Sequence, residues 1–135
     1  MPKERPKDEG WVPGWLMKKQ PPLHLIGLYS IIILRYADHE LDVFCMSQST
    51  MAQDMGVSVD TIRRWLCQLE DIGALVKWSR YDKYGGRRSD FVALCWEGPY
   101  QVRLEQVEKG KEKGAKIPPT HIHTNFSSPK EISHG

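Results

Sequence analysis

A glycine between two segments that each begin with serine is the feature that most constrains this fold. Gly56 separates a predicted helix at about residues 48–55 from another at about residues 58–72. Glycine adopts the left-handed conformation that ends a helix and turns the chain sharply. The hydroxyls of Ser47 and Ser58 stand where they can cap the next helix by accepting a backbone hydrogen bond. The sequence therefore predicts two short helices joined by a tight turn.

The second of these helices has one apolar and one polar side. Ile62, Leu66 and Leu69 recur at helical spacing and form the side expected to be buried. Asp60 lies in the first turn, where the helix dipole favours a carboxylate, and Arg64 follows one turn later, where it can pair with Asp60. The polar side consists of Asp60, Thr61, Arg63, Arg64, Cys67, Gln68 and Asp71.

A third predicted helix, at about residues 23–36, precedes this pair and is apolar nearly all round. Ile31 and Leu34 fall outside its main face, so something besides the domain's own core must cover them. Two candidates are the segment around Trp11 and Trp15, which we expect to pack on the domain as an extended arm, and a second copy of the chain. The main face consists of Leu25, Leu28, Tyr29, Ile32 and Tyr36.

Beyond the helices the apolar pattern changes to a period of two, which is typical of β-strands. Residues 75–80 and 89–96 are two such runs, and they bracket the sequence YDKYGGRR. Gly85 and Gly86, in the sequence between the two predicted strands, favour the positive φ angles of a hairpin loop. We therefore expect a β-hairpin directly after the helical pair.

The predicted hairpin is strongly basic, and only Asp82 and Asp90 oppose its positive charge. Such a ribbon suits contact with phosphates, because each neutralised phosphate releases counterions. The alternative is protection of an exposed strand edge, which does not require charges of one sign. The basic residues are Lys77, Arg80, Lys83, Arg87 and Arg88.

This order of elements predicts an α+β fold, a winged helix-turn-helix with a three-helix core and a β-hairpin wing. Tyr100, Leu104 and Val107 are spaced as one face of a further short helix. The segment after it is rich in Gly, Lys, Glu, Pro and Ser and is expected to be disordered. The expected units are a disordered N-terminus at residues 1–10, the domain with its arm at 11–98, the short helix at 99–108 and the tail at 109–135.

Composition and motifs exclude several classes of function. The 135 residues carry 19 basic and 17 acidic side chains, and this net charge of +2 does not by itself indicate a nucleic-acid partner. Three separated cysteines give no paired spacing for zinc or disulfides, and His121 and His123 have no third ligand nearby. No motif for nucleotide binding or nucleophilic catalysis occurs. We therefore expect no enzyme activity, cofactor, metal or small-molecule substrate.

The predicted helices and hairpin together resemble a known protein family. FCMSQSTMAQDMGVSVDTIRRWLCQLEDIGALVK, residues 44–77, and the hairpin RYDKYGGRRSDFVAL after it resemble winged helix-turn-helix domains of bacterial, plasmid and phage DNA-binding proteins. The resemblance covers about residues 11–96. It is nearest to the group in which a helix similar to LHLIGLYSIIILRYA precedes the motif, and whose members are associated with replication initiation and transcriptional control. Trp65 stands where that family usually has a small or aliphatic residue, and we expect it to enlarge the core rather than border a phosphate backbone.

The resemblance implies a bacterial protein of the cytoplasm and nucleoid. The charged N-terminus MPKERPKDEG has no apolar run behind it, so we expect neither an export signal nor a membrane anchor. Self-association through the helix at residues 23–36 or through the segment after Pro99 is expected, because one small module contacts limited DNA surface.

The leading hypothesis from the sequence is sequence-specific binding of double-stranded DNA, in transcriptional regulation or in recognition of a replication or recombination site. The helix at 58–72 would enter the major groove, and the wing at about 77–90 would contact the backbone or the minor groove. The alternative is a winged-helix module that binds a protein partner in a replisome or phage assembly. The expected DNA-binding residues are Ser58, Asp60, Thr61, Arg63, Arg64, Gln68, Arg80, Lys83, Arg87 and Arg88.

Overall fold

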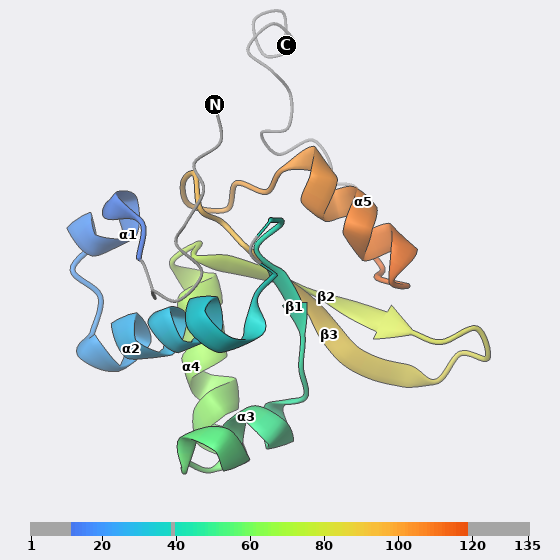
Figure 1. Cartoon of the computed structure of the whole chain (residues 1–135), viewed down its shortest axis with the longest axis horizontal. Helices are drawn as coiled ribbons and strands as arrows, with labels where there is room; N and C mark the ends of the chain where they lie inside the picture. The colour runs from blue at the N-terminus through green and yellow to red at the C-terminus, as the bar shows by residue number, and fades with distance from the viewer. Residues whose placement is uncertain (1–11, 39, 119–135) are drawn as a thin grey trace, which may run out of the picture.

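The structure is a computed structural model that describes residues 12–38 and 40–118 (Figure 1). A single three-stranded antiparallel sheet in the order β1-β3-β2 packs against the helices. Because a helical core carries a β-hairpin wing, the expected α+β winged-helix class is confirmed. The elements are α1 (Gly14–Lys18), α2 (Leu23–Ile31), the π-helical segment η1 (Ile32–Tyr36), β1 (Val43–Cys45), α3 (Gln48–Met55), α4 (Val59–Asp71), β2 (Leu75–Tyr81), β3 (Arg87–Leu94) and α5 (Leu104–Glu112).

The α3–α4 pair forms as its sequence predicts. Ser47 Oγ accepts a hydrogen bond from the backbone N–H of Thr50 at 3.0 Å, and Ser58 Oγ accepts one from that of Thr61 at 3.0 Å. Gly56 ends α3 at a φ of 70°, in the left-handed region. The two helices are therefore each capped by their own serine and joined by the expected glycine turn.

The main core lies between the helices and one side of the sheet. The apolar side of α4 is fully buried there, as expected, together with Leu28 and Tyr29 of α2. Trp65 is half-buried and packs against this core, as expected, and its ring lies 4.9 Å from that of His24. The strands contribute Phe44, Leu75, Val92 and Leu94 to the same cluster.

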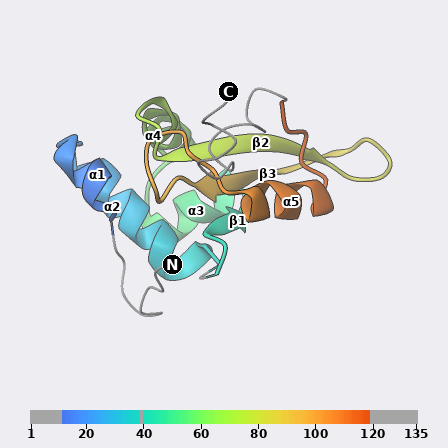
Figure 2. The ribbon, with the colours of Figure 1, turned by 90° about the horizontal axis from the view of Figure 1, so that it is seen from above.

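A second core lies on the other side of the sheet and was not expected from the sequence. Trp78 and Phe91 stack there with ring centroids 5.8 Å apart, and Val102 and Val107 cover them from the segment of α5. Burial raises the pKa of the Cys95 thiol in this core to about 12, so this cysteine serves as an apolar packing group. Figure 2 shows α5 and α4 on opposite sides of the sheet.

The C-terminal helix α5 lies later in the chain than predicted. It extends into the segment that was expected to be disordered. It spans Leu104–Glu112 rather than lying within 99–108, and Tyr100 stands before it at a φ of 63°. Residues 113–118 then continue along the sheet, so the first part of the expected tail at 109–135 is structured. Residues 119–135, with His121 and His123, lie outside the described residues.

The N-terminal arm packs on the domain as expected, but it is helical rather than extended. Leu16 of α1 is fully buried, and the indole N–H of Trp15 donates to the backbone carbonyls of Cys95 at 3.2 Å and Trp96 at 3.1 Å. Trp11 and the expected disordered residues 1–10 lie outside the described part of the chain. The arm is thus tied to the end of the sheet by a tryptophan hydrogen bond.

Two apolar side chains, one on α2 and one on η1, are exposed to solvent. Leu23 is 83% exposed, and Leu34 of η1 is 43% exposed. Neither α1 nor any other described element buries these two side chains. Among the described residues, no helix combines the length and the apolar character needed to cross a membrane.

We predict that Gln106→Leu destabilises the fold, because Gln106 fastens α5 to the sheet from a fully buried position. Its side-chain amide donates to the carbonyls of Leu41 at 2.9 Å and Leu94 at 3.0 Å. Leucine would leave these buried acceptors without that donor, at a cost of about 1–3 kcal/mol. Urea unfolding measures the loss, with Glu108→Leu on the exposed side of α5 as the control. Equal stabilities of the two variants would contradict this role of Gln106.

Candidate nucleic-acid interface

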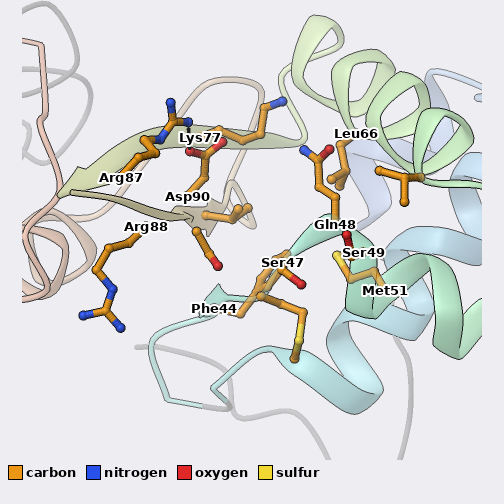
Figure 3. A pocket seen from close by; sticks show the side chains of 14 residues that line it. Phe44, Ser47, Gln48, Ser49, Met51, Leu66, Lys77, Arg87, Arg88 and Asp90 are labelled. Carbon is orange, nitrogen blue, oxygen red and sulfur yellow. Dashed lines mark hydrogen bonds and ion pairs between the residues drawn. The ribbon is translucent and has the colours of Figure 1, made fainter. Parts of the chain in front are cut away.

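A groove of about 360 Å³ lies between the α3–α4 pair and the wing (Figure 3). Val59 and Leu66 of α4 form its floor on one side, and Lys77 of β2 lies between α4 and the wing. The groove shows that the helical pair and the wing share one concave surface. The remaining lining comes from β1 and the residues after it, the N-terminal turn of α3 and the start of β3: Phe44, Met46, Ser47, Gln48, Ser49, Met51, Arg87, Arg88, Ser89, Asp90 and Val92.

Two arginines are exposed on α4, the helix that contributes Val59 and Leu66 to this groove. The side chains of Arg63 and Arg64 are 56% and 57% exposed, and neither α1 nor α5 covers them. Asp60, one turn earlier, pairs with both: Arg63 Nη2 donates to one carboxylate oxygen, and Arg64 Nη1 lies 3.4 Å from the other. The expected pair of Asp60 and Arg64 is therefore present and includes Arg63. Exposed ion pairs of this kind are weak and exchange readily with other partners.

Three further residues that were expected to bind DNA from α4 already form hydrogen bonds within the protein. Ser58 and Thr61 form the helix cap, in which Ser58 Oγ also donates to Thr61 Oγ1 at 2.9 Å. Gln68 Oε1 lies 2.9 Å from His24 Nε2 on α2. The expected DNA-binding residues of α4 that are exposed and outside these contacts are therefore Asp60, Arg63 and Arg64, and Cys67 and Asp71 are exposed farther along the helix.

The cations of the wing differ in whether they form an ion pair within the protein. Arg87 Nη2 donates to Asp90 Oδ1 at 2.7 Å, and this hydrogen bond raises the pKa of the arginine, which keeps its charge. Arg88 is exposed and makes no ion pair with another described residue. Figure 3 shows Arg87 and Arg88 pointing to opposite sides of the strand. Lys83 is exposed at the tip, with its Nζ 5.5 Å from the centroid of the Tyr84 ring.

Arg80 differs from its expected role as an exposed wing cation. It is only 8% exposed, and its Nε donates to the carbonyl of Ser89 at 2.7 Å. Its Nη1 lies 3.4 Å from the carbonyl of Lys113, beyond α5. Arg80 therefore fastens the two strands to the C-terminal segment, and we exclude it from the interface.

The wing tip is held by one carboxylate. Asp82 Oδ1 accepts hydrogen bonds from the backbone N–H of Tyr84 at 2.9 Å and of Gly86 at 2.7 Å. Gly85 adopts a φ of 87°, whereas Gly86 does not take the positive φ that the sequence suggested. Asp82 thus fixes the conformation of the loop that carries Lys83.

The N-terminal turn of α3 contributes to this groove, which the sequence did not predict. Gln48 and Ser49 line it at the N-terminal turn of the helix, where backbone N–H groups are not used inside the helix. The N-terminal cap at Ser47 could have indicated this contribution, but in the sequence it predicts only the start of a helix. Among the described residues, no group of three or more histidine, cysteine or acidic side chains could hold a metal ion.

Comparison with known proteins identifies the helical part of this surface. Residues 28–75 match the sequence model of a family described as a helix-turn-helix domain. The match runs from α2 to the first residue of β2, so it includes α3, the Gly56 turn and α4 but not the wing or α5. No curated protein and no solved structure matches the chain. The chain therefore contains a helix-turn-helix domain, to which the structure adds the wing and α5.

We predict that Ser58→Ala lowers the free energy of unfolding by about 1 kcal/mol, because it removes the side-chain acceptor at the start of α4. Ser58→Gly should cost only a few tenths of a kcal/mol, roughly as glycine does at other N-caps. Chemical denaturation compares the two, with Ser49→Ala inside α3 as the control. A loss for Ser49→Ala as large as that for Ser58→Ala would contradict the capping role.

Proposed function

We propose that this protein binds double-stranded DNA in a sequence-specific manner, with α4 in the major groove and the wing on the phosphate backbone or in the minor groove. One observation carries the proposal: Arg87 and Arg88 of the wing line one groove together with Val59 and Leu66 of α4, the helix of the helix-turn-helix domain that also exposes Arg63 and Arg64. A helix of this kind fits the major groove, and its N-terminal residues meet the base edges first.

The arrangement of α4 supports direct contact with bases. Arg63 and Arg64 lie in its first two turns and can each donate two hydrogen bonds to O6 and N7 of guanine. Asp60 lies beside both guanidinium groups in the free protein, and these exposed ion pairs can exchange for contacts to bases. Its carboxylate can also accept a hydrogen bond from the amino group of cytosine. We assign base selection to these three residues.

The remaining expected residues suit contact with phosphates and sugars. Arg88 and Lys83 are exposed on the wing, and Arg87 can exchange its bond to Asp90 for one to a phosphate. Thr61, at the cap of α4, lies where a hydroxyl can reach the backbone of the duplex. Gln68 contributes only if its hydrogen bond to His24 opens. These contacts would fix the orientation of the protein without selecting a sequence.

We further propose a role in transcriptional control or in marking a replication or recombination site, through paired or repeated half-sites. Self-association would involve α2, where Leu23 and Leu34 remain exposed. The segment after Pro99 is the second candidate, because Tyr100 and Leu104 are exposed there although Val102 and Val107 are buried on the chain's own sheet. Sedimentation of the free protein and of its complex with a selected site tests this arrangement.

We predict that Arg64→Ala costs about 1–3 kcal/mol on the preferred site and relaxes the base preference, because a bidentate contact to guanine is lost. Sites are first selected from a pool of random duplexes. Binding of the wild type and the variant is then titrated on the selected site and on single-base variants of it. Equal losses for Arg64→Ala on all of these duplexes would contradict the assignment to base selection.

We predict that Arg88→Ala weakens binding to all duplexes by a similar factor and lowers the slope of log K against log salt by about 1, because one phosphate contact is lost. Arg35→Ala on η1 removes the same charge from an exposed site away from the groove and serves as the control. If wild-type protein shows no affinity for random duplex that falls with salt, the DNA-binding proposal is wrong, and a protein partner becomes the better interpretation.

A further inference from the structure

The segment after α5 pairs with the outer edge of the wing. β2 is an edge strand of the sheet, and Arg80 forms an isolated antiparallel bridge with Ala115 along that edge. The N–H of Lys116 donates to the carbonyl of Ser79 at 2.8 Å, and the N–H of Tyr81 donates to the carbonyl of Gly114 at 3.3 Å. Residues 113–116, which we call the edge segment, thus act as a short additional strand.

This pairing requires a glycine at position 114. Gly114 has a φ of 88°, a conformation that other residues rarely adopt. A Cβ at this position would lie 2.7 Å from the carbonyl oxygen of Tyr81, which is backbone and cannot move aside without opening the pairing. The close approach of the edge segment to β2 therefore depends on Gly114.

The buried guanidinium of Arg80 reinforces the same contact. Its hydrogen bonds join β3, through the carbonyl of Ser89, to the edge segment, through the carbonyl of Lys113. The charge on this side chain is thus used inside the fold. The edge segment is consequently attached to both strands of the wing rather than to β2 alone.

The edge segment brings a further cation to the wing. Lys116 is exposed, and its Nζ lies 5.8 Å from the centroid of the Tyr81 ring; the guanidinium carbon of Arg87 lies 5.9 Å from the same centroid. A second groove, of about 700 Å³, is lined by Lys83, Lys116, Tyr81 and their neighbours. Figure 2 shows the chain after α5 running to β2 at the edge of the sheet.

We propose that Lys116 is a phosphate-binding residue of the wing, and that residues 113–116 position it by pairing with β2. This inference rests on the proposed function and extends it, because it assigns a third segment of the chain to the DNA backbone. Arg87 and Lys116 then flank the Tyr81 ring, and Lys83 lines the same groove as Lys116 together with Asp82. A duplex that meets the groove-side cations of the wing would present its neighbouring phosphates to these cations.

Salt-dependent titration tests the role of Lys116. Fluorescently labelled random duplex is titrated with the full chain at several salt concentrations, and Lys116→Gln is compared with Lys18→Gln. Both variants lose one positive charge, but Lys18 lies on α1, far from the wing (Figure 1). Lys116→Gln should lower the slope of log K against log salt by about 0.9, the loss of one phosphate contact, while Lys18→Gln should leave it near the wild-type value.

A second variant tests the positioning. Gly114→Ala should release the edge segment, and hydrogen exchange should then show loss of protection at the Lys116 amide, which donates to Ser79 in the wild type. Gly114→Ala should also weaken binding to all duplexes, and adding Lys116→Gln to it should cost less than Lys116→Gln does alone. Gly14→Ala, where a Cβ meets nothing within 4 Å, is the matched control. Unchanged protection of the Lys116 amide would overturn the positioning role.

The outcomes separate this inference from the function on which it rests. If wild-type protein binds duplex with a steep salt dependence and Lys116→Gln behaves like Lys18→Gln, the role of Lys116 is wrong and the proposed function stands. If wild-type protein does not bind duplex at all, both are wrong. A reduced slope for Lys116→Gln with an unchanged base preference supports both.

Discussion

The double pairing of β3 is the constraint on which the candidate interface depends. β3 lies between β1 and β2, so both of its edges are used inside the domain. Its faces also serve two cores: Val92 packs toward the helices, whereas Phe91 and Ala93 pack toward α5. A shift of one residue would exchange these faces, so the register is strongly specified. Arg88, at the start of the strand, is therefore placed relative to α4 by the packing of the whole sheet and not by the loop alone.

The α3–α4 pair was predictable because its signals act over short distances along the chain. Ser47, Gly56 and Ser58 each determine the backbone within three or four residues, and the observed helices begin and end where these residues predict. The exposed position of Arg63 and Arg64 followed from the periodicity of the same helix. This part of the site needed no knowledge of the rest of the fold.

The remaining features depended on contacts that are distant in sequence. Arg80 looked like its basic neighbours in the wing, but it is buried by a segment that begins 33 residues later, at Lys113. The composition from Lys109 onward suggested disorder, yet α5 continues to Glu112 and is stabilised by Val107, by the buried amide of Gln106 and by close packing at Gly110. Composition rules count apolar residues, and they do not register one buried amide with three carbonyl partners.

The pairing of cations with carboxylates explains how a chain with a net charge of only +2 can suit a DNA surface. Asp60 neutralises part of the charge on α4, and Asp90 does the same for Arg87. Arg63, Arg64 and Arg87 therefore each have a carboxylate partner, whereas Arg88 on the wing has none among the residues that the structure describes. At a matching site, guanine acceptors and phosphates replace these carboxylates at short range, where geometry decides the energy. Cations such as Arg88 then supply the salt-dependent affinity for any duplex, and the arginines that exchange a carboxylate for a guanine supply the part of the affinity that depends on sequence.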